Sequence, residues 1–425
     1  MKTRNFFVLF LILAFLFPAI SFAQVPNEKP LRDFQLSIIP YFGTEGRDAA
    51  NYRYNFSLNL FAGVTGGLEG FEAGGFMNIN TGSAKGAQFA GFGNLVHGDM
   101  EGFQGSGFMN LVHGNTRAFQ GAGFINFISG STEGFHGAGF INVFGGNSRS
   151  FTGAGFANVT GGHFEGFLGS GFANVTGGNV KGFQGAGFAN VTGGRFEGFQ
   201  GAGFANVTGN EAKGLQAAGF MNINRDFKGA QIAGFLNAAR KVEGVQIGFL
   251  NIADTVDGVP IGFLSIVKKG AYRQIEVSGS DVIHLGASFR IGVPAFYNIF
   301  SYGIRPFASE KVHGFGYGIG TSISFSQNTG MQIEGHSSQL RQDWKWDDEH
   351  LDMLNELRIT MGTRLAGRIE LFAGPVLFNH IYKYQPENGI YGSDLASYTL
   401  DEKRWDDYVS KWWIGARGGL RVKLD

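Results

Sequence analysis

The chain has 425 residues, 34 basic and 34 acidic side chains, and no cysteine. A net charge of zero gives no general attraction to nucleic acid or anionic lipid, and the missing cysteines exclude disulfides and thiol chemistry. Glycine, with 70 residues, and phenylalanine, with 45, both exceed their usual shares by far. This composition argues against two or three ordinary globular domains.

Residues 1–23 have the three parts of a secretory signal peptide. Basic residues precede an apolar run at 6–17, and the triplet Ser-Phe-Ala at 21–23 is a small-x-small cleavage site. We therefore expect an exported protein whose mature chain begins at Gln24. No later stretch is long and apolar enough for a membrane helix, so a membrane-spanning form would have to be a β-barrel.

Residues 24–65 form an N-terminal segment in which 34–42 and 54–62 are predicted strands. Residues 66–270 form one long repeat region. Asparagine recurs there every 16 residues from 78 to 222, then at 237 and 251, and serine takes its place at 265. A phenylalanine stands two residues before each of these positions, preceded by a glycine. Representative structural positions are Phe156, Phe172, Phe188 and Phe204 with Asn158, Asn174, Asn190 and Asn206.

The repeat unit contains too much glycine for a helix, and its apolar spacing does not match 3.6 residues. Short strands separated by glycine corners remain. The unit that begins at Gly244 is one residue shorter than the unit that begins at Gly229, and the lost residue lies between the Gln half and the Phe-x-Asn half. A residue that can be lost without disturbing its flanks lies at a corner or bulge. Each unit therefore predicts two short strands.

Two architectures are compatible with this unit. In a β-solenoid each unit is one coil, like residues stack about 4.8 Å apart, and thirteen coils give a rod of roughly 60 Å. Phenylalanines would then form ladders, and asparagines would form an amide ladder. In a transmembrane barrel each unit would be one strand with its turn. We favour the solenoid, because a barrel built from this unit would have like turns at both ends and a lipid face rich in glycine and alanine.

Residues 271–425 lose the repeat and alternate cleanly between apolar and polar residues. Ile283, Leu285, Ala287 and Phe289 share one face of such a segment, opposite Arg290. Further strands are predicted near 319–325, 331–340, 356–365, 368–378, 411–417 and 420–424. A count near eight is typical of a small antiparallel barrel or sandwich. The polar inserts 341–352 and 384–410 are predicted loops at one end.

Aromatic residues beside carboxylates form the only candidate ligand patch that we single out, and such pairs can bind sugars or calcium. The patch comprises Trp344, Trp346, Asp347, Asp348, Trp412 and Trp413. A solvated loop or an aromatic girdle at a membrane surface is the competing interpretation. No Ser-His-Asp set or metal-ligand spacing is visible, so we predict no catalytic residue, no metal and no cofactor.

The segment Gly-Val-Gln-Ile-Gly-Phe-Leu-Asn-Ile at 244–252, followed by Gly-Val-Pro-Ile-Gly-Phe-Leu-Ser-Ile at 258–266, resembles the bacterial surface-repeat family first described in spirochaetes. The layout of strands, repeats and tail is also similar to exported proteins of Bacteroidota, over most of residues 34–424. This resemblance implies a place at the cell surface or in the outer membrane. It carries no catalytic residue to this chain.

These observations predict a non-enzymatic protein of the cell envelope with a structural or binding role. An outer-membrane β-barrel pore is one alternative, because the C-terminal segments alternate. A carbohydrate-binding protein is another, because of the Trp and Asp residues. Outer-membrane or envelope components are the expected partners, and nucleic acid is not.

Overall fold

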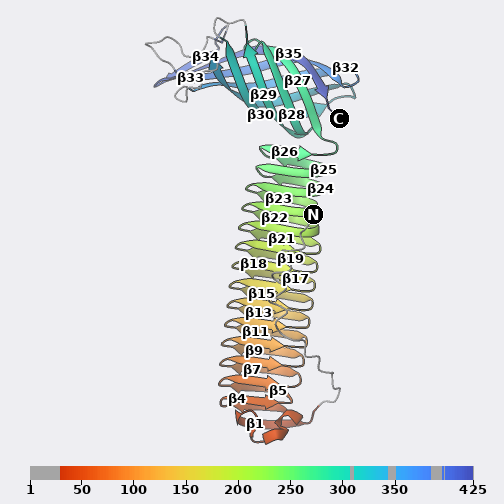
Figure 1. Ribbon diagram of the computed structural model, residues 1–425, viewed down its shortest axis with the longest axis vertical. Coiled ribbons are helices and arrows are strands. Elements are labelled where there is room, and N and C mark those ends of the chain that lie inside the picture. Colours follow the sequence, from red (N-terminus) through yellow and green to blue (C-terminus); the bar gives the residue numbers. More distant parts are fainter. Residues whose placement is uncertain (1–28, 307–310, 343–350, 384–394, 397, 425) are drawn as a thin grey trace.

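The computed structural model describes residues 29–306, 311–342, 351–383, 395–396 and 398–424. The expected signal peptide and four residues of the predicted patch, Trp344, Trp346, Asp347 and Asp348, lie outside these residues. The described chain forms a long parallel stack of strands and, at one end of it, an antiparallel barrel (Figure 1). Among the described residues no helix is long and apolar enough to cross a membrane.

Each coil of the parallel stack contains one long and one short strand, as the two-strand interpretation of the repeat predicts. The long strands are β5 (Gly67–Gly74), β7 (Ala84–Ala90), β9 (Met100–Ser106), β11 (Thr116–Ala122), β13 (Thr132–Ala138), β15 (Ser148–Ala154), β17 (Phe164–Ser170), β19 (Val180–Ala186) and β21 (Phe196–Ala202). The short strands are β4 (Ala62–Thr65), β6 (Met77–Asn80), β8 (Gly93–Val96), β10 (Met109–Val112), β12 (Ile125–Ile128), β14 (Ile141–Phe144), β16 (Ala157–Thr160), β18 (Ala173–Thr176), β20 (Ala189–Thr192) and β26 (Leu264–Val267).

Equivalent strands of successive coils pair in parallel and in register. Residues 180–186 of β19 pair one to one with residues 196–202 of β21, and residues 173–176 of β18 with 189–192 of β20. Every coil therefore hydrogen-bonds to the coil before and after it, and the repeat region is a β-solenoid rather than part of one large barrel. It is a rod whose coils lie across its length (Figure 1).

Two amide ladders run along the inside of the rod in opposite directions. Each asparagine donates to the asparagine one coil later, as Asn174 Nδ2 does to Asn190 Oδ1 at 2.9 Å. Where two successive coils both carry glutamine, the later one donates to the earlier, as Gln200 Nε2 does to Gln184 Oε1 at 2.7 Å. His136, Thr152 and Leu168 hold the glutamine position in three successive coils and interrupt this ladder. The predicted asparagine ladder is thus confirmed. It runs without a break from Asn59 to Asn251, because every coil in that range supplies an asparagine.

The shortened repeats lose their residues at the two corners of a coil. The first loss follows the short strand, where the register between β22 (Ala205–Ala218) and β23 (Met221–Ala233) shifts between Thr208 and Glu211. The second residue is lost at the corner between the Gln and Phe-x-Asn halves, just before β25 (Leu250–Ile261), as the sequence predicts. From β22 to β25 the short and long strands of a coil form one continuous strand, as in β24 (Leu236–Ile247).

The first coil and the N-terminal segment belong to the same stack. Strand β1 (Leu31–Ile39) pairs in parallel with β3 (Arg53–Asn59), and β3 pairs with β5. Strand β2 (Phe42–Gly43) folds back antiparallel on β1, and the 3-10 helix η1 (Gly46–Asn51) follows it. This hairpin covers part of an open strand edge that would otherwise pair with other chains.

The C-terminal region is a closed antiparallel barrel of eight strands, with one further strand beside its last. The eight are β27 (Tyr272–Ser280), β28 (Leu285–Val293), β29 (Phe296–Arg305), β30 (Val312–Ser324), β31 (Thr329–Gln342), β32 (Asp352–Ala366), β33 (Ile369–Lys383) and β35 (Tyr408–Lys423), and β34 (Asp401–Trp405) is the addition. Closure comes from the pairing of β27 with β35. The sequence patterns missed β27 and β29, placed β34 inside the predicted loop 384–410, and divided β35 into two strands.

The barrel wall caps the last coil of the rod. Asn298 of β29 donates from Nδ2 to the carbonyl oxygen of Gly262 at 2.7 Å, and its Oδ1 accepts from the amide of Ser265 at 3.1 Å. The hydroxyl of Tyr317 donates to the carbonyl oxygen of Phe263 at 3.2 Å. These contacts satisfy polar groups at the open end of the parallel stack and tie the rod to the barrel.

Candidate functional site

The inside of the barrel holds a balanced set of buried charges. Arg290, Arg358, Arg417 and Arg421 face Glu276, Glu334, Glu356 and Glu370. Glu276 alone contacts three guanidinium groups, with Oε2 2.6 Å from Arg290 Nη2 and 2.8 Å from Arg421 Nε, and Oε1 2.7 Å from Arg417 Nη2. Because buried charges need partners, this network is a structural requirement of a polar interior.

The other half of the barrel interior holds an apolar cluster and one buried polar pair, His380 and Asp352, whose Nε2 and Oδ1 atoms lie 2.6 Å apart. Val312, Leu340, Leu354, Val376 and Phe378 pack there around Trp413, whose ring centroid lies 5.3 Å from that of Phe378. Residues from the loops, Val282 and Leu395, close the cluster. The interior is therefore filled mainly by charged side chains near the rod and mainly by apolar side chains at the far end.

The outside of the barrel is apolar along the middle of its strands. Outward-facing side chains such as Leu357, Ile359 and Met361 on β32 alternate with the inward Glu356, Arg358 and Thr360, which are buried. The same holds for Ile414, Leu420 and Val422 on β35 against the inward Arg417 and Arg421. This distribution is the reverse of a water-soluble barrel, whose apolar side chains face inward.

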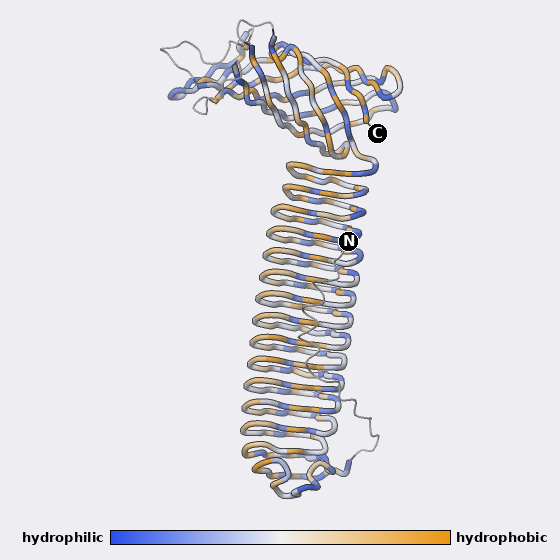
Figure 2. Tube along the Cα trace, in the orientation of Figure 1, coloured by the Kyte–Doolittle hydropathy of each residue, from blue (hydrophilic) through white to orange (hydrophobic). Residues whose placement is uncertain are grey.

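The rod is amphipathic across its width. Figure 2 shows hydrophobic residues along one edge and hydrophilic residues along the opposite edge. The phenylalanine edge consists of the corner residues Phe61, Phe76, Phe92, Phe108, Phe124, Phe140, Phe156, Phe172, Phe188, Phe204, Phe220, Phe235, Phe249 and Phe263. Beside it, the outward residues of the short strands are apolar, as are Ala189 and Val191 of β20.

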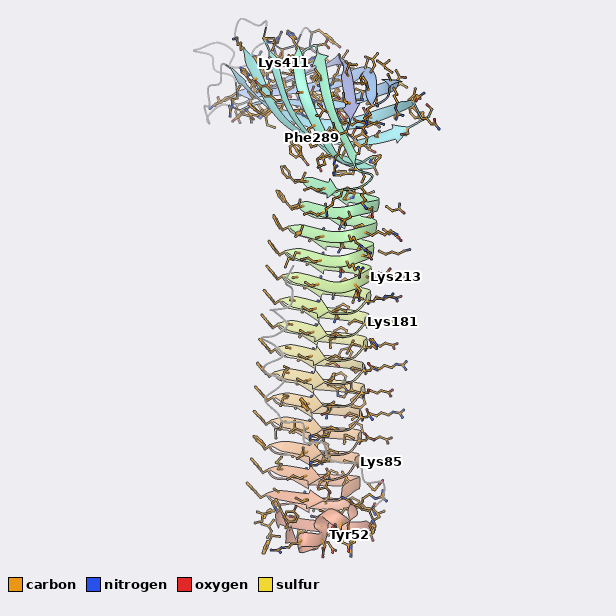
Figure 3. The ribbon with its side chains drawn as sticks, turned by 45° about the vertical axis from the view of Figure 1, so that its right-hand side comes forward. Tyr52, Lys85, Lys181, Lys213, Phe289 and Lys411 are labelled. Carbon is orange, nitrogen blue, oxygen red and sulfur yellow. The ribbon has the colours of Figure 1, made fainter. Side chains whose placement is uncertain are left out.

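The charged edge carries one charged residue per coil, and its sign alternates. Its residues, in register along the rod, are Lys85, Glu101, Arg117, Glu133, Arg149, Glu165, Lys181, Glu197 and Lys213. Lys85, Lys181 and Lys213 project away from the rod (Figure 3). Opposite charges one coil apart attract weakly, as between Lys213 and Glu197 at 3.6 Å, whereas a run of like charges would repel. From Lys85 to Lys213 no two neighbouring coils therefore carry like charges at this position, and the alternation ends where Lys213 pairs with Lys228.

A hollow of about 760 Å³ lies at the end of the rod far from the barrel. Leu36 of β1, Leu58 of β3, and Leu60 line it, together with Phe89 of β7, and we call it the distal hollow. Phe89 stands at the position that glycine 105 holds in the next coil. The hollow is thus an apolar depression on the long-strand side of the first coils.

Glu72 is the one acidic residue of the glutamine ladder, and it stands at the ladder's first position. Its carboxylate accepts from Ser57 Oγ, Asn59 Nδ2 and Asn80 Nδ2, each at 3.0 Å, and from Gln88 Nε2 at 2.8 Å. Burial raises the pKa of Glu72, while these hydrogen bonds oppose the rise. Because the ladder donates toward this end, a side chain that accepts from all four donors suits the position.

The structure separates the described members of the predicted patch. Trp412 is partly exposed on the outside of β35, whereas Trp413 is buried inside the barrel.

The asparagines of the four Asn-Val-Thr sequences at 158, 174, 190 and 206 are buried in the rod. His97 and His113 stack with ring centroids 5.1 Å apart. Among the described residues no group of three or more potential metal ligands comes together.

The sequence missed the surfaces that stand out in three dimensions. Alternation in residues 271–425 was visible, but it did not indicate that the apolar face points outward. The alternating signs of the charged edge could have been read at the 16-residue period.

No protein-family model, no curated protein and no solved structure matches this chain.

Proposed function

We propose that this protein is a structural or interaction protein of the outer membrane, in which the barrel is the anchor and the solenoid is a rigid rod. The observation that carries the proposal is the inverted barrel, apolar outside and charged inside. In lipid every backbone polar group must be paired internally, and a closed barrel satisfies this requirement. The partly exposed Trp412 suits the aromatic belt at a membrane surface.

The lengths of the barrel connections suggest an orientation. On the side of the rod, β28 and β29, β30 and β31, and β32 and β33 are joined by two to four residues; on the other side β31–β32 and β33–β35 are joined by longer segments. Outer-membrane barrels have short periplasmic turns and longer outer loops. The rod then extends into the periplasm.

A pore is the second candidate, and the filled interior of the barrel disfavours it. The charge network blocks the half near the rod, and the apolar cluster around Trp413 blocks the other half. We therefore expect far less conductance than from a water-filled barrel.

The test is membrane assembly of the full chain with a charge placed on the outer wall. Ile359→Lys puts a cation at an outward position that is 41% exposed in the middle of β32. A lysine near the bilayer midplane costs about 2–4 kcal/mol, so we expect loss of the heat-modifiable folded form in isolated envelopes. Carbonate should leave the unchanged protein in the membrane, and detergent should release it.

Asn328→Lys in the turn between β30 and β31 is the matched control, because a cation there stays in water. Release of the unchanged protein by carbonate, or equal assembly of both variants, would contradict the proposal.

A further inference from the structure

The phenylalanine edge is one unbroken stack of rings. Each corner ring stacks on its neighbour in the next coil, with centroids 4.7–5.7 Å apart over all thirteen contacts. Most of these side chains remain more than a third exposed, as Phe188 is at 42%. Contiguous exposed apolar surface of this extent marks an interaction site.

The chemistry of this edge excludes several kinds of ligand. Ring faces are covered by neighbouring rings, so only ring edges are presented, and a sugar has no face on which to stack. Backbone amides and carbonyls are paired between coils, as Phe188 N is to Phe172 O at 2.8 Å and Phe204 N to Phe188 O at 2.9 Å. A peptide strand therefore has no ladder to join. A ligand without polar groups suits a surface that offers none.

The ring stack continues onto the outer wall of the barrel. Phe263, the last ring, lies 4.9 Å from the ring of Tyr317 and 6.0 Å from that of Phe300. Phe300 pairs across the strands with Phe289, so the aromatic surface extends along the wall that faces lipid in the proposed anchor. Phe289 lies on the barrel close to the end of the rod (Figure 3).

The other end of the ring stack reaches the distal hollow. Phe61 follows Leu60, which lines the hollow, and glycines 75 and 91, which precede Phe76 and Phe92, also line it. An apolar path therefore extends from the outer wall of the barrel, along the rod, to an apolar depression of a size that holds small ligands.

We infer that the phenylalanine edge and the distal hollow bind the acyl chains of membrane lipids. The inference rests on the proposed outer-membrane anchor, because only that anchor brings the first rings of the path into contact with lipid. An extended acyl chain lies along the ring edges, and burial of apolar surface provides the affinity. The charged edge stays in water.

The test uses the full chain in phosphatidylethanolamine–phosphatidylglycerol vesicles that contain a phospholipid with a diazirine on its acyl chain. After irradiation, adducts are mapped by mass spectrometry. We expect adducts on the outer wall of the barrel, on the phenylalanine edge and in the distal hollow, and none on the charged edge.

The informative variant is the double substitution Phe140→Gln and Phe156→Gln. Both residues point out of the rod, so the internal ladders stay intact, and circular dichroism checks the fold. Loss of two apolar contacts should lower labelling of the rod between these rings and the hollow by about tenfold. Glu133→Gln with Arg149→Gln, which removes one charge of each sign on the opposite edge, is the matched control and should label like the unchanged protein.

The outcomes separate this inference from the proposed function. Adducts on the barrel but not on the rod, or equal adducts on both edges of the rod, overturn the inference and leave the anchor in place. Adducts on neither overturn both. An unlabelled rod together with a chemically crosslinked dimer through the phenylalanine edge overturns it in favour of a second copy.

Discussion

Asn174 illustrates how single side chains hold the rod together. Its Nδ2 donates to Asn190 Oδ1 and to the carbonyl oxygen of Gly185, and its Oδ1 accepts from Asn158 Nδ2. One buried side chain therefore satisfies polar groups in neighbouring coils, and each group left without a partner would cost about 1–3 kcal/mol. The period of the sequence predicted this role for the solenoid alternative, because stacked coils place identical amides one above another.

His136 interrupts the glutamine ladder and should make the stability of the rod depend on pH. Its Nδ1 lies 3.2 Å from Gln120 Oε1, and burial lowers its pKa from 6.5 to about 4. The folded chain thus keeps His136 neutral while the unfolded chain takes up a proton. The contribution of His136 to the free energy of unfolding is fully present above pH 6.5. It is lost as the pH drops toward 4, and the loss is about 3 kcal/mol at most.

His136→Gln restores an amide to the ladder and should remove this pH dependence. The measurement is the urea midpoint of the full chain in detergent at pH 7.5 and 4.5, for the unchanged protein and the variant. Comparison of the variant with the unchanged protein cancels the opposite contribution of Glu72. Its raised pKa gives a stabilisation that is present at low pH and is lost as the pH rises. An equal shift in both proteins would refute the role of His136.

At the scale of the element, the coil depends on glycines that let neighbouring backbones approach. Gly182 has a φ of 126°, a conformation that side chains disfavour, and a Cβ there would lie 2.1 Å from the carbonyl oxygen of Gly166. Other glycines of the unit are open: a Cβ at Gly121 would meet nothing within 4 Å. The abundance of glycine in the sequence does not distinguish these two kinds of position.

Gly182→Ala should therefore destabilise the rod, and Gly121→Ala should not. The first forces strain and a clash between coils, with an expected loss of at least about 2 kcal/mol. The second adds a methyl group to open surface of a strand and should change stability by less than about 0.5 kcal/mol. Urea unfolding of both variants measures the difference, and equal midpoints would show that the close approach is unimportant.

At the scale of the whole molecule, the contacts of Asn298 and Tyr317 fix the angle between rod and barrel. Asn298 bonds to both the donor and the acceptor that the last coil presents, and it also donates to the Tyr317 hydroxyl at 2.8 Å. Under the function that we propose, this junction would hold the rod in one direction relative to the membrane, as a spacer in the envelope requires.

Asn298→Ala should loosen this junction without unfolding either part. Because the chain has no cysteine, spin labels on cysteines introduced at Lys213 and Asn328 report one distance between rod and barrel. We expect double electron–electron resonance to show a broader distribution of that distance in the variant. Lys403→Ala, at an exposed position of β34 on the other side of the barrel, is the control and should leave the distribution unchanged. An unchanged width in Asn298→Ala would mean that the junction does not depend on this residue.

The sequence by itself determined the repeat unit and the corner between its two halves, and it favoured a solenoid with an asparagine ladder, because stacked coils repeat equivalent residues at a fixed period. The structure decided for the solenoid over one large barrel, because it shows equivalent strands paired in parallel. It also indicated an antiparallel C-terminal region, because strands alternate. Only the tertiary structure decided which face of each barrel strand points outward, since alternation is identical for a soluble and an inverted barrel. It alone brought Phe263 against Tyr317 and Phe300, because packing of the barrel wall on the last coil joins residues that have no fixed spacing in the chain.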